Sequence, residues 1–138
     1  MLDIIANYCI FVNSMLYFKN LEDKLNMHIV SEIRVKDPSH LRDMQSFITE
    51  IDEILESAGV QNLGKVSHDF DGDGYTVAVI LGESHVTVHT WPDLGIVTCD
   101  VYLCNFKNDN TDKAENIHLG ICHFFDSTHV NSARLLRI

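Results

Sequence analysis

The chain has 138 residues, of which 46% are hydrophobic and 22% are charged, and these proportions fit one compact globular domain without low-complexity segments. Its formal net charge of −10 argues against a surface that binds DNA or RNA, because such a surface needs clustered lysine and arginine side chains. A small cationic substrate is compatible with this charge.

Residues 1–26 are interpreted as an N-terminal extension of unknown role, followed by one domain over residues 27–138. The apolar stretch that opens the extension is interrupted by Asp3, Asn7 and Asn13 and has no basic leader. We therefore expect neither a signal peptide nor a membrane span. Without an export signal, the four cysteines are expected to be reduced thiols in the cytoplasm.

The first predicted elements are a strand that begins at Met27 and a helix that begins at Pro38. Asp37 and Pro38 are typical of an N-cap and a first helical residue, and Gly59 is typical of the end of a helix. The apolar positions between them follow the helical period: Leu41, Met44, Ile48, Ile51 and Leu55.

Three strands are predicted after this helix, over residues 62–70, 75–82 and 84–90, with a tight turn at residues 71–74 between the first two. Residues 95–104 then alternate in character, which predicts a fourth strand and puts Cys104 on its more polar face. The two faces comprise Val97, Cys99, Val101 and Leu103 on one side, and Thr98, Asp100, Tyr102 and Cys104 on the other.

The C-terminal part predicts a second helix and a last strand over residues 128–137. The helix is indicated by Ala114, Ile117, Ile121 and Phe124. Consecutive strands joined by short turns favour an antiparallel sheet with helices packed on one face. The predicted fold class is therefore α+β, a two-layer sandwich with a mainly antiparallel sheet.

Residues 83–92, Glu-Ser-His-Val-Thr-Val-His-Thr-Trp-Pro, closely resemble the processing site of S-adenosylmethionine decarboxylases of the short prokaryotic type. In that family a Glu-Ser-His segment leads into a His-Thr-Trp-Pro segment. The resemblance covers residues 27–138 and is strongest from Phe70 to Cys104. Gly74, Thr76 and the apolar run that follows also match the family pattern, with Thr76 where the family usually carries a serine.

Decarboxylation of an amino acid leaves an electron pair on the α carbon, and no ordinary side chain can accept it. A carbonyl cofactor that condenses with the substrate amine supplies the electron sink that pyridoxal phosphate supplies elsewhere. The resemblance implies that Ser84 becomes this cofactor. Its hydroxyl attacks the carbonyl of Glu83, the chain is cut between residues 83 and 84, and Ser84 becomes an N-terminal pyruvoyl group.

The resemblance also implies roles for the neighbouring side chains. His89 would be the acid or base of processing, with support from Glu83 and Thr76, and Cys104 would donate the proton after carbon dioxide leaves. In a regular strand Ser84 and His89 point to opposite faces, because they are five residues apart. We therefore expect either a bulge between them or a Ser84 that lies outside the regular strand.

By resemblance, the substrate is S-adenosylmethionine and the product is the aminopropyl donor for spermidine synthesis. Glu32 aligns with a carboxylate that binds the ribose hydroxyls, and Phe70 aligns with an aromatic residue that stacks on adenine. The family's cleaved protomers form homodimers with active sites near the subunit interface, which is expected here as well.

The chain departs from the family pattern at several positions. Asn105 replaces the glycine that usually follows the cysteine, and asparagine can adopt the left-handed backbone that glycine permits. Val97 and Thr98 replace two small residues, and Asp93 replaces a glutamate.

Three alternatives stay open at this point. A relative with the same fold could lack processing, or the pyruvoyl group could decarboxylate another amino acid such as ornithine or arginine. A metal site is the natural competitor, given eight histidines and four cysteines. Because no compact Cys-x-x-Cys or paired histidine motif is present, we expect no metal.

Overall fold

The structure is a computed structural model that describes residues 25–137. The extension expected over residues 1–26 lies outside the described residues, apart from Leu25 and Asn26. Asn26 is the first residue of strand β1, so the sheet begins one residue before the expected boundary. Among the described residues, no helix is both long and apolar enough to cross a bilayer.

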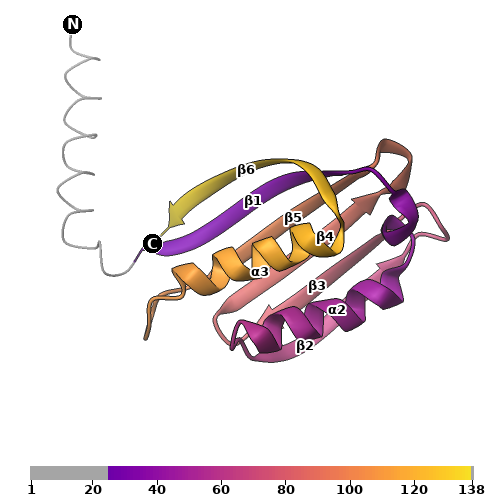
Figure 1. The fold of residues 1–138 in the computed structure, drawn as a ribbon. Coiled ribbons are helices and arrows are strands. Elements are labelled where there is room, and N and C mark those ends of the chain that lie inside the picture. The colour runs from indigo at the N-terminus through magenta and orange to yellow at the C-terminus, as the bar shows by residue number, and fades with distance from the viewer. Residues whose placement is uncertain (1–24, 138) are drawn as a thin grey trace, which may run out of the picture.

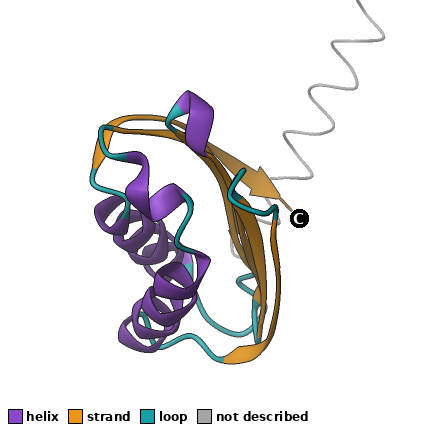
Figure 2. Cartoon of the chain, turned by 90° about the vertical axis from the view of Figure 1, so that its right-hand side faces the viewer, coloured by secondary structure: helices purple, strands orange, loops and turns teal. Residues whose placement is uncertain are grey.

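Six antiparallel strands form one sheet in the order β2-β3-β4-β5-β1-β6. Helices α2 and α3 lie against the same face of this sheet, and neither covers the opposite face, which we call the open face (Figure 1, Figure 2). The predicted two-layer α+β fold is confirmed. The elements are β1 (Asn26–Val35), α2 (Met44–Ser57), β2 (Asn62–Asp69), β3 (Tyr75–Leu81), β4 (Ser84–Trp91), β5 (Ile96–Leu103), α3 (Thr111–Phe124) and β6 (Ser127–Arg137), with short 3-10 helices η2 (Pro38–Leu41) and η3 (Pro92–Leu94).

Alternation along β4 and β5 decides which side chains reach the open face. In β5 the predicted inward residues Val97, Cys99, Val101 and Leu103 are buried, and the intervening residues are not. In β4, residues 86, 88 and 90 are buried and the residues between them are only partly covered. The sequence pattern therefore assigned both faces correctly, except at Cys104, which follows the end of β5 at Leu103.

The first helix begins later than predicted. Pro38 opens only the short 3-10 helix η2, and α2 begins at Met44, where the Asp43 side chain accepts a hydrogen bond from the Ser46 N–H at 3.0 Å. The Asp43 carboxylate accepts a hydrogen bond from a first-turn amide that has no partner within the helix. This contact favours a new helix that starts at Met44 over one continuous helix from Pro38. The predicted end is confirmed, since Gly59 follows α2 with a φ of 68°.

The hydrophobic core lies between the helices and the inward face of the sheet. Phe47, Ile51 and Leu55 of α2 are each 0–1% exposed, as are Ile117 and Ile121 of α3. Burying each of these side chains contributes on the order of 1.5–3 kcal/mol relative to leaving it exposed. This layer holds the strands rigidly, so positions on the open face are set by the register of the sheet.

Candidate active site

The peptide bond between Glu83 and Ser84 lies where the chain turns from β3 into β4. Leu81 pairs with Ser84, so only Gly82 and Glu83 connect the two strands. Ser84 has a φ of 141°, which a residue with a β carbon rarely adopts. Such backbone conformations cost about 1–3 kcal/mol and concentrate at functional sites. Backbone strain therefore adjoins the bond that is predicted to break.

The carbonyl group of Glu83 is held by the main chain of Cys104. The Cys104 N–H donates a hydrogen bond to the Glu83 oxygen at 2.9 Å. One carboxylate oxygen of Glu83, Oε2, is buried and has no hydrogen-bond partner among the described residues. Glu83 and Cys104 line a cavity of about 350 Å³ together with Lys107 and Asn110. The structure thus brings Cys104 to the predicted cleavage site.

His85 is the imidazole beside Ser84, and the sequence reasoning gave it no role. Its Nδ1 lies 3.1 Å from the Ser84 hydroxyl. Adjacent residues of a regular strand point to opposite faces, so this contact depends on the irregular backbone at Ser84. His85 pairs with Tyr102 across the sheet, and Tyr102 pairs with His28, whose Nε2 lies 2.9 Å from an oxygen of Asp100. His85, Tyr102 and His28 thus lie side by side across three strands, and this arrangement follows only from the pairing of β4 and β1 with β5.

His89 lies in a second group of side chains, at the other end of β4. It pairs with Thr76 of β3, and its Nδ1 lies 2.5 Å from the Thr76 hydroxyl. Its ring centroid is 5.5 Å from that of Phe70 and 4.3 Å from that of Trp91. Partial burial removes solvent from His89 and lowers its pKa below the ordinary 6.5. The structure therefore brings three predicted residues together here: Thr76, His89 and Phe70.

The structure does not bring Ser84 and His89 together within one chain. They are five residues apart on β4, which corresponds to about 16 Å along the strand. The register between β3 and β4 runs without interruption from Thr76 to Ser84, so the bulge that we expected as one possibility is absent there. Ser84 instead lies at the irregular start of the strand.

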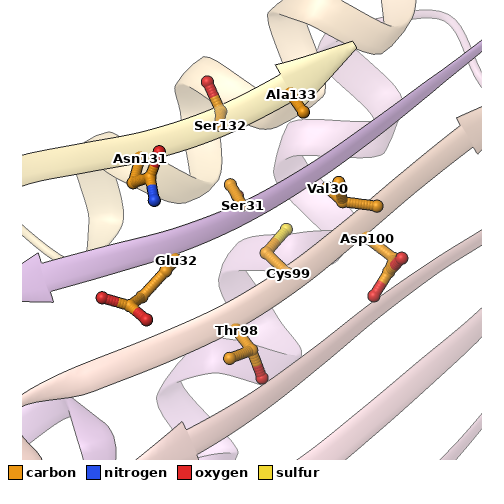
Figure 3. Close-up of a pocket in the computed structure, with 9 residues that line it drawn as sticks. All are labelled: Val30, Ser31, Glu32, Thr98, Cys99, Asp100, Asn131, Ser132 and Ala133. Carbon is orange, nitrogen blue, oxygen red and sulfur yellow. The ribbon is translucent and has the colours of Figure 1, made fainter. Parts of the chain in front are cut away.

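Glu32 belongs to the same cross-strand row as His89. Both residues pair with Thr98, Glu32 from β1 and His89 from β4. Figure 3 shows Glu32 beside a depression of about 390 Å³ that spans β5, β1 and β6 on the open face. Its carboxylate is 3.1 Å from the Arg34 guanidinium. Glu32 is thus two strands from His89, and the cross-strand row that they share is five residues from the row of Ser84, Leu103 and Met27.

Two departures from the family pattern have structural outcomes. The backbone of Asn105 does not adopt the left-handed conformation that we considered, and its side chain makes hydrogen bonds instead. Asp93 is exposed and forms an ion pair with Arg42 at 3.0 Å. Over residues 25–137, the histidine, cysteine and acidic side chains form no group of three placed to hold a metal ion.

Comparison with known proteins agrees with this arrangement. The S-adenosylmethionine decarboxylase family model matches residues 27–137. An S-adenosylmethionine decarboxylase proenzyme from Pyrobaculum islandicum is 41% identical over 86 residues, which are 62% of this chain and 66% of the relative. The proenzyme from Parasynechococcus marenigrum is 35% identical over 77 residues, 56% and 60% of the two chains. The matched part is therefore just under two thirds of the length of these relatives.

A solved structure shares the fold. The adenosylmethionine decarboxylase from Aquifex aeolicus superimposes with a TM-score of 0.73 over 83% of this chain and 91% of that one, at 23% identity. The family match extends from β1 through β6 and includes the Glu83–Ser84 bond, Thr76, His89 and Cys104. The chain belongs to the S-adenosylmethionine decarboxylase family.

Proposed function

We propose that this chain is the precursor of a pyruvoyl-dependent enzyme that decarboxylates S-adenosylmethionine in the cytoplasm and so supplies the aminopropyl donor for spermidine synthesis. The observation that carries this proposal is the strained backbone of Ser84 beside a carbonyl that accepts a hydrogen bond from Cys104. A strained residue is expected where a reaction relieves the strain. Family membership supplies the type of reaction.

Self-cleavage would begin at the Glu83 carbonyl. The Ser84 hydroxyl oxygen bonds to the carbonyl carbon while its proton passes to a base, and the developing negative charge on the Glu83 oxygen is stabilised by the Cys104 N–H. The C–N bond then breaks, which leaves an ester and the free amine of Ser84. Loss of the α proton expels the Glu83 carboxylate and yields dehydroalanine. Water then replaces its nitrogen as ammonia, which leaves a pyruvoyl group.

The residues around Ser84 fit this group. A pyruvoyl group at position 84 would supply the electron sink for decarboxylation. Cys104 follows β5 directly beside the connection between β3 and β4, and its half-buried thiol would donate a proton to the substrate α carbon.

We further propose that the working enzyme is a homodimer in which one protomer's Thr76 and His89 serve the partner's Ser84. About 16 Å of strand separates Ser84 from His89 within one chain, so His89 cannot exchange a proton with its own Ser84. The open face also exposes apolar side chains that a second copy would cover: Val66 is 70% exposed and Ile80 is 61% exposed. Val66 pairs with Ala78, two residues from Thr76, and Ile80 pairs with His85 at the Ser84 end of the site.

The substrate would lie between the two halves of such a site. Phe70 is 41% exposed beside His89, so its ring is available to stack on adenine. Glu32, in the row of His89, would accept hydrogen bonds from the ribose hydroxyls after release from Arg34. The adenosyl group would then contact one protomer, and the amino acid end would reach the pyruvoyl group of the other.

Processing is expected to require neutral His89, which predicts its pH dependence. Because desolvation lowers the pKa of His89 below the ordinary 6.5, more than half of the rings are neutral at pH 6.5. The cleavage rate should therefore reach its plateau at high pH and fall to half of that plateau at a pH below 6.5. Rates measured across this range by intact mass test the prediction, with His123→Gln as a control far from Ser84. A half-maximal rate above pH 6.5 would contradict it.

The function itself is tested by mass and by carbon dioxide release. Purified protein should separate into residues 1–83 and a pyruvoyl-blocked fragment of residues 84–138, and carboxyl-labelled S-adenosylmethionine should release label. Label released only from ornithine or arginine would replace the proposed substrate. If the chain stays uncleaved and releases no label from S-adenosylmethionine, ornithine or arginine, the protein is a family member that does not undergo processing.

Cys104→Ala separates the two roles of this residue. Cleavage should continue, because alanine keeps the backbone N–H that contacts the Glu83 carbonyl. Turnover should fall about 10²–10⁴-fold, the usual contribution of a positioned proton donor. Cys122→Ala, a buried cysteine of α3, is the matched control and should keep both activities. Normal turnover in Cys104→Ala would show that another group donates the proton.

A further inference from the structure

Asn105 connects the loop after β5 to two other elements. Its Nδ2 donates to the Leu25 carbonyl at 2.6 Å, and its backbone N–H donates to the Asn26 Oδ1 at 2.7 Å. Its own Oδ1 accepts from the Asn110 N–H at 2.8 Å. The segment that carries Cys104 is thus bound to the start of β1 on one side and to the start of α3 on the other.

Asn110 completes this network at Cys104. It occupies the N-cap position of α3, yet its side chain makes no capping hydrogen bond. Its Nδ2 donates instead to the Cys104 carbonyl at 2.8 Å. The residue is only 3% exposed, and its Oδ1 is buried without a hydrogen-bond partner in residues 25–137. An asparagine that gives up a helix cap and leaves an acceptor unsatisfied indicates that the contact with Cys104 has a use beyond stability.

Both main-chain groups of Cys104 are therefore held. The N–H points to the Glu83 carbonyl at 2.9 Å, and the carbonyl is bound by Asn110 at 2.8 Å. A hydrogen-bond donor stabilises a developing oxyanion best when it already points at the oxygen before the reaction starts. The orientation of the Cys104 N–H therefore affects the rate of self-cleavage. The same backbone carries the thiol, so its orientation matters for turnover as well.

We propose that Asn110, supported by Asn105, is a positioning residue that orients Cys104 for two steps: the backbone N–H for self-cleavage and the thiol for proton donation. This inference rests on the proposed function. It assigns the two steps to different atoms of one residue and makes both depend on one side-chain amide. Loss of that amide should therefore slow cleavage and turnover together, whereas loss of the thiol affects turnover alone.

The test compares Asn110→Asp and Asn110→Ser with the wild-type chain. Both replacements are good N-caps, and neither has an amide to donate to the Cys104 carbonyl. The serine variant also avoids a buried carboxylate at this position, which is only 3% exposed. One is charged and the other neutral, so an effect that they share is not due to charge. We expect cleavage of freshly synthesised precursor to slow about tenfold or more in both. The cleaved fraction should have a lower kcat with an unchanged KM, because Glu32 and Phe70 are untouched.

Asp109→Ala is the matched control in the same loop. It removes the hydrogen bond from the Thr111 N–H to Asp109 at 2.9 Å and leaves Cys104 and its partners in place. This variant should cleave at the wild-type rate, and Asn105→Ala should slow cleavage. Equal slowing in Asp109→Ala, or wild-type cleavage in Asn110→Asp and Asn110→Ser, would overturn the positioning role. A wild-type chain that never cleaves would instead contradict the proposed function.

Discussion

Replacing Ser84 with alanine is expected to abolish both chain cleavage and carbon dioxide release. Alanine has no hydroxyl to attack the Glu83 carbonyl, and no other described side chain can become the α-keto group at this position. Intact mass should show one uncleaved chain, and labelled S-adenosylmethionine should release no label. Carbon dioxide release at the wild-type rate by Ser84→Ala would exclude the pyruvoyl mechanism.

Ser84→Gly is the paired variant that tests the strain. Both variants stay uncleaved, but glycine accepts a φ of 141° and alanine does not. The glycine variant should therefore unfold at a higher denaturant concentration than the alanine variant. Its free energy of unfolding should be greater by about 1 kcal/mol, because the strain that it avoids exceeds the cost of the greater entropy of glycine in the unfolded chain. If Ser84→Ala is the more stable of the two, Ser84 carries no strain that cleavage could release.

Mixing two inactive chains is expected to restore cleavage. Neither His89→Ala nor Ser84→Ala should be cleaved alone, the first for want of the histidine and the second for want of the nucleophile. In a mixed dimer, the Ser84→Ala protomer supplies His89 to the intact Ser84 of its partner. Co-expression with distinguishable tags should thus give cleaved His89→Ala chains, and intact mass identifies which chain is cut.

The control for this experiment is a double variant. A chain with both Ser84→Ala and His89→Ala, co-expressed with His89→Ala, has no intact histidine to offer at either site and should leave every chain whole. Cleavage of His89→Ala on its own at the wild-type rate would remove His89 from processing. Absence of cleavage in the mixed dimer, despite dimer formation, would contradict the exchange of residues between protomers.

Much of the fold was predictable from local patterns. The inward residues of β5 were assigned correctly because alternate burial has a period of two in any strand with one covered face. The end of α2 just before Gly59 and the presence of the helix α3 followed from equally local rules. The predicted start of the first helix was wrong. The 3-10 helix η2, which begins at Pro38, ends at Leu41, and α2 begins after its own N-cap at Asp43.

The amino-acid sequence by itself determined the fold class and the family, and it predicts the bond that breaks, Glu83–Ser84, since each depends on local patterns of residues. Only the tertiary structure decided that the backbone of Cys104, rather than its thiol alone, meets the Glu83 carbonyl. Only folding joins Asn105 to Leu25, 80 residues away. Such contacts depend on which strands pair and where each ends, and strand pairing is set by the packing of the whole sheet.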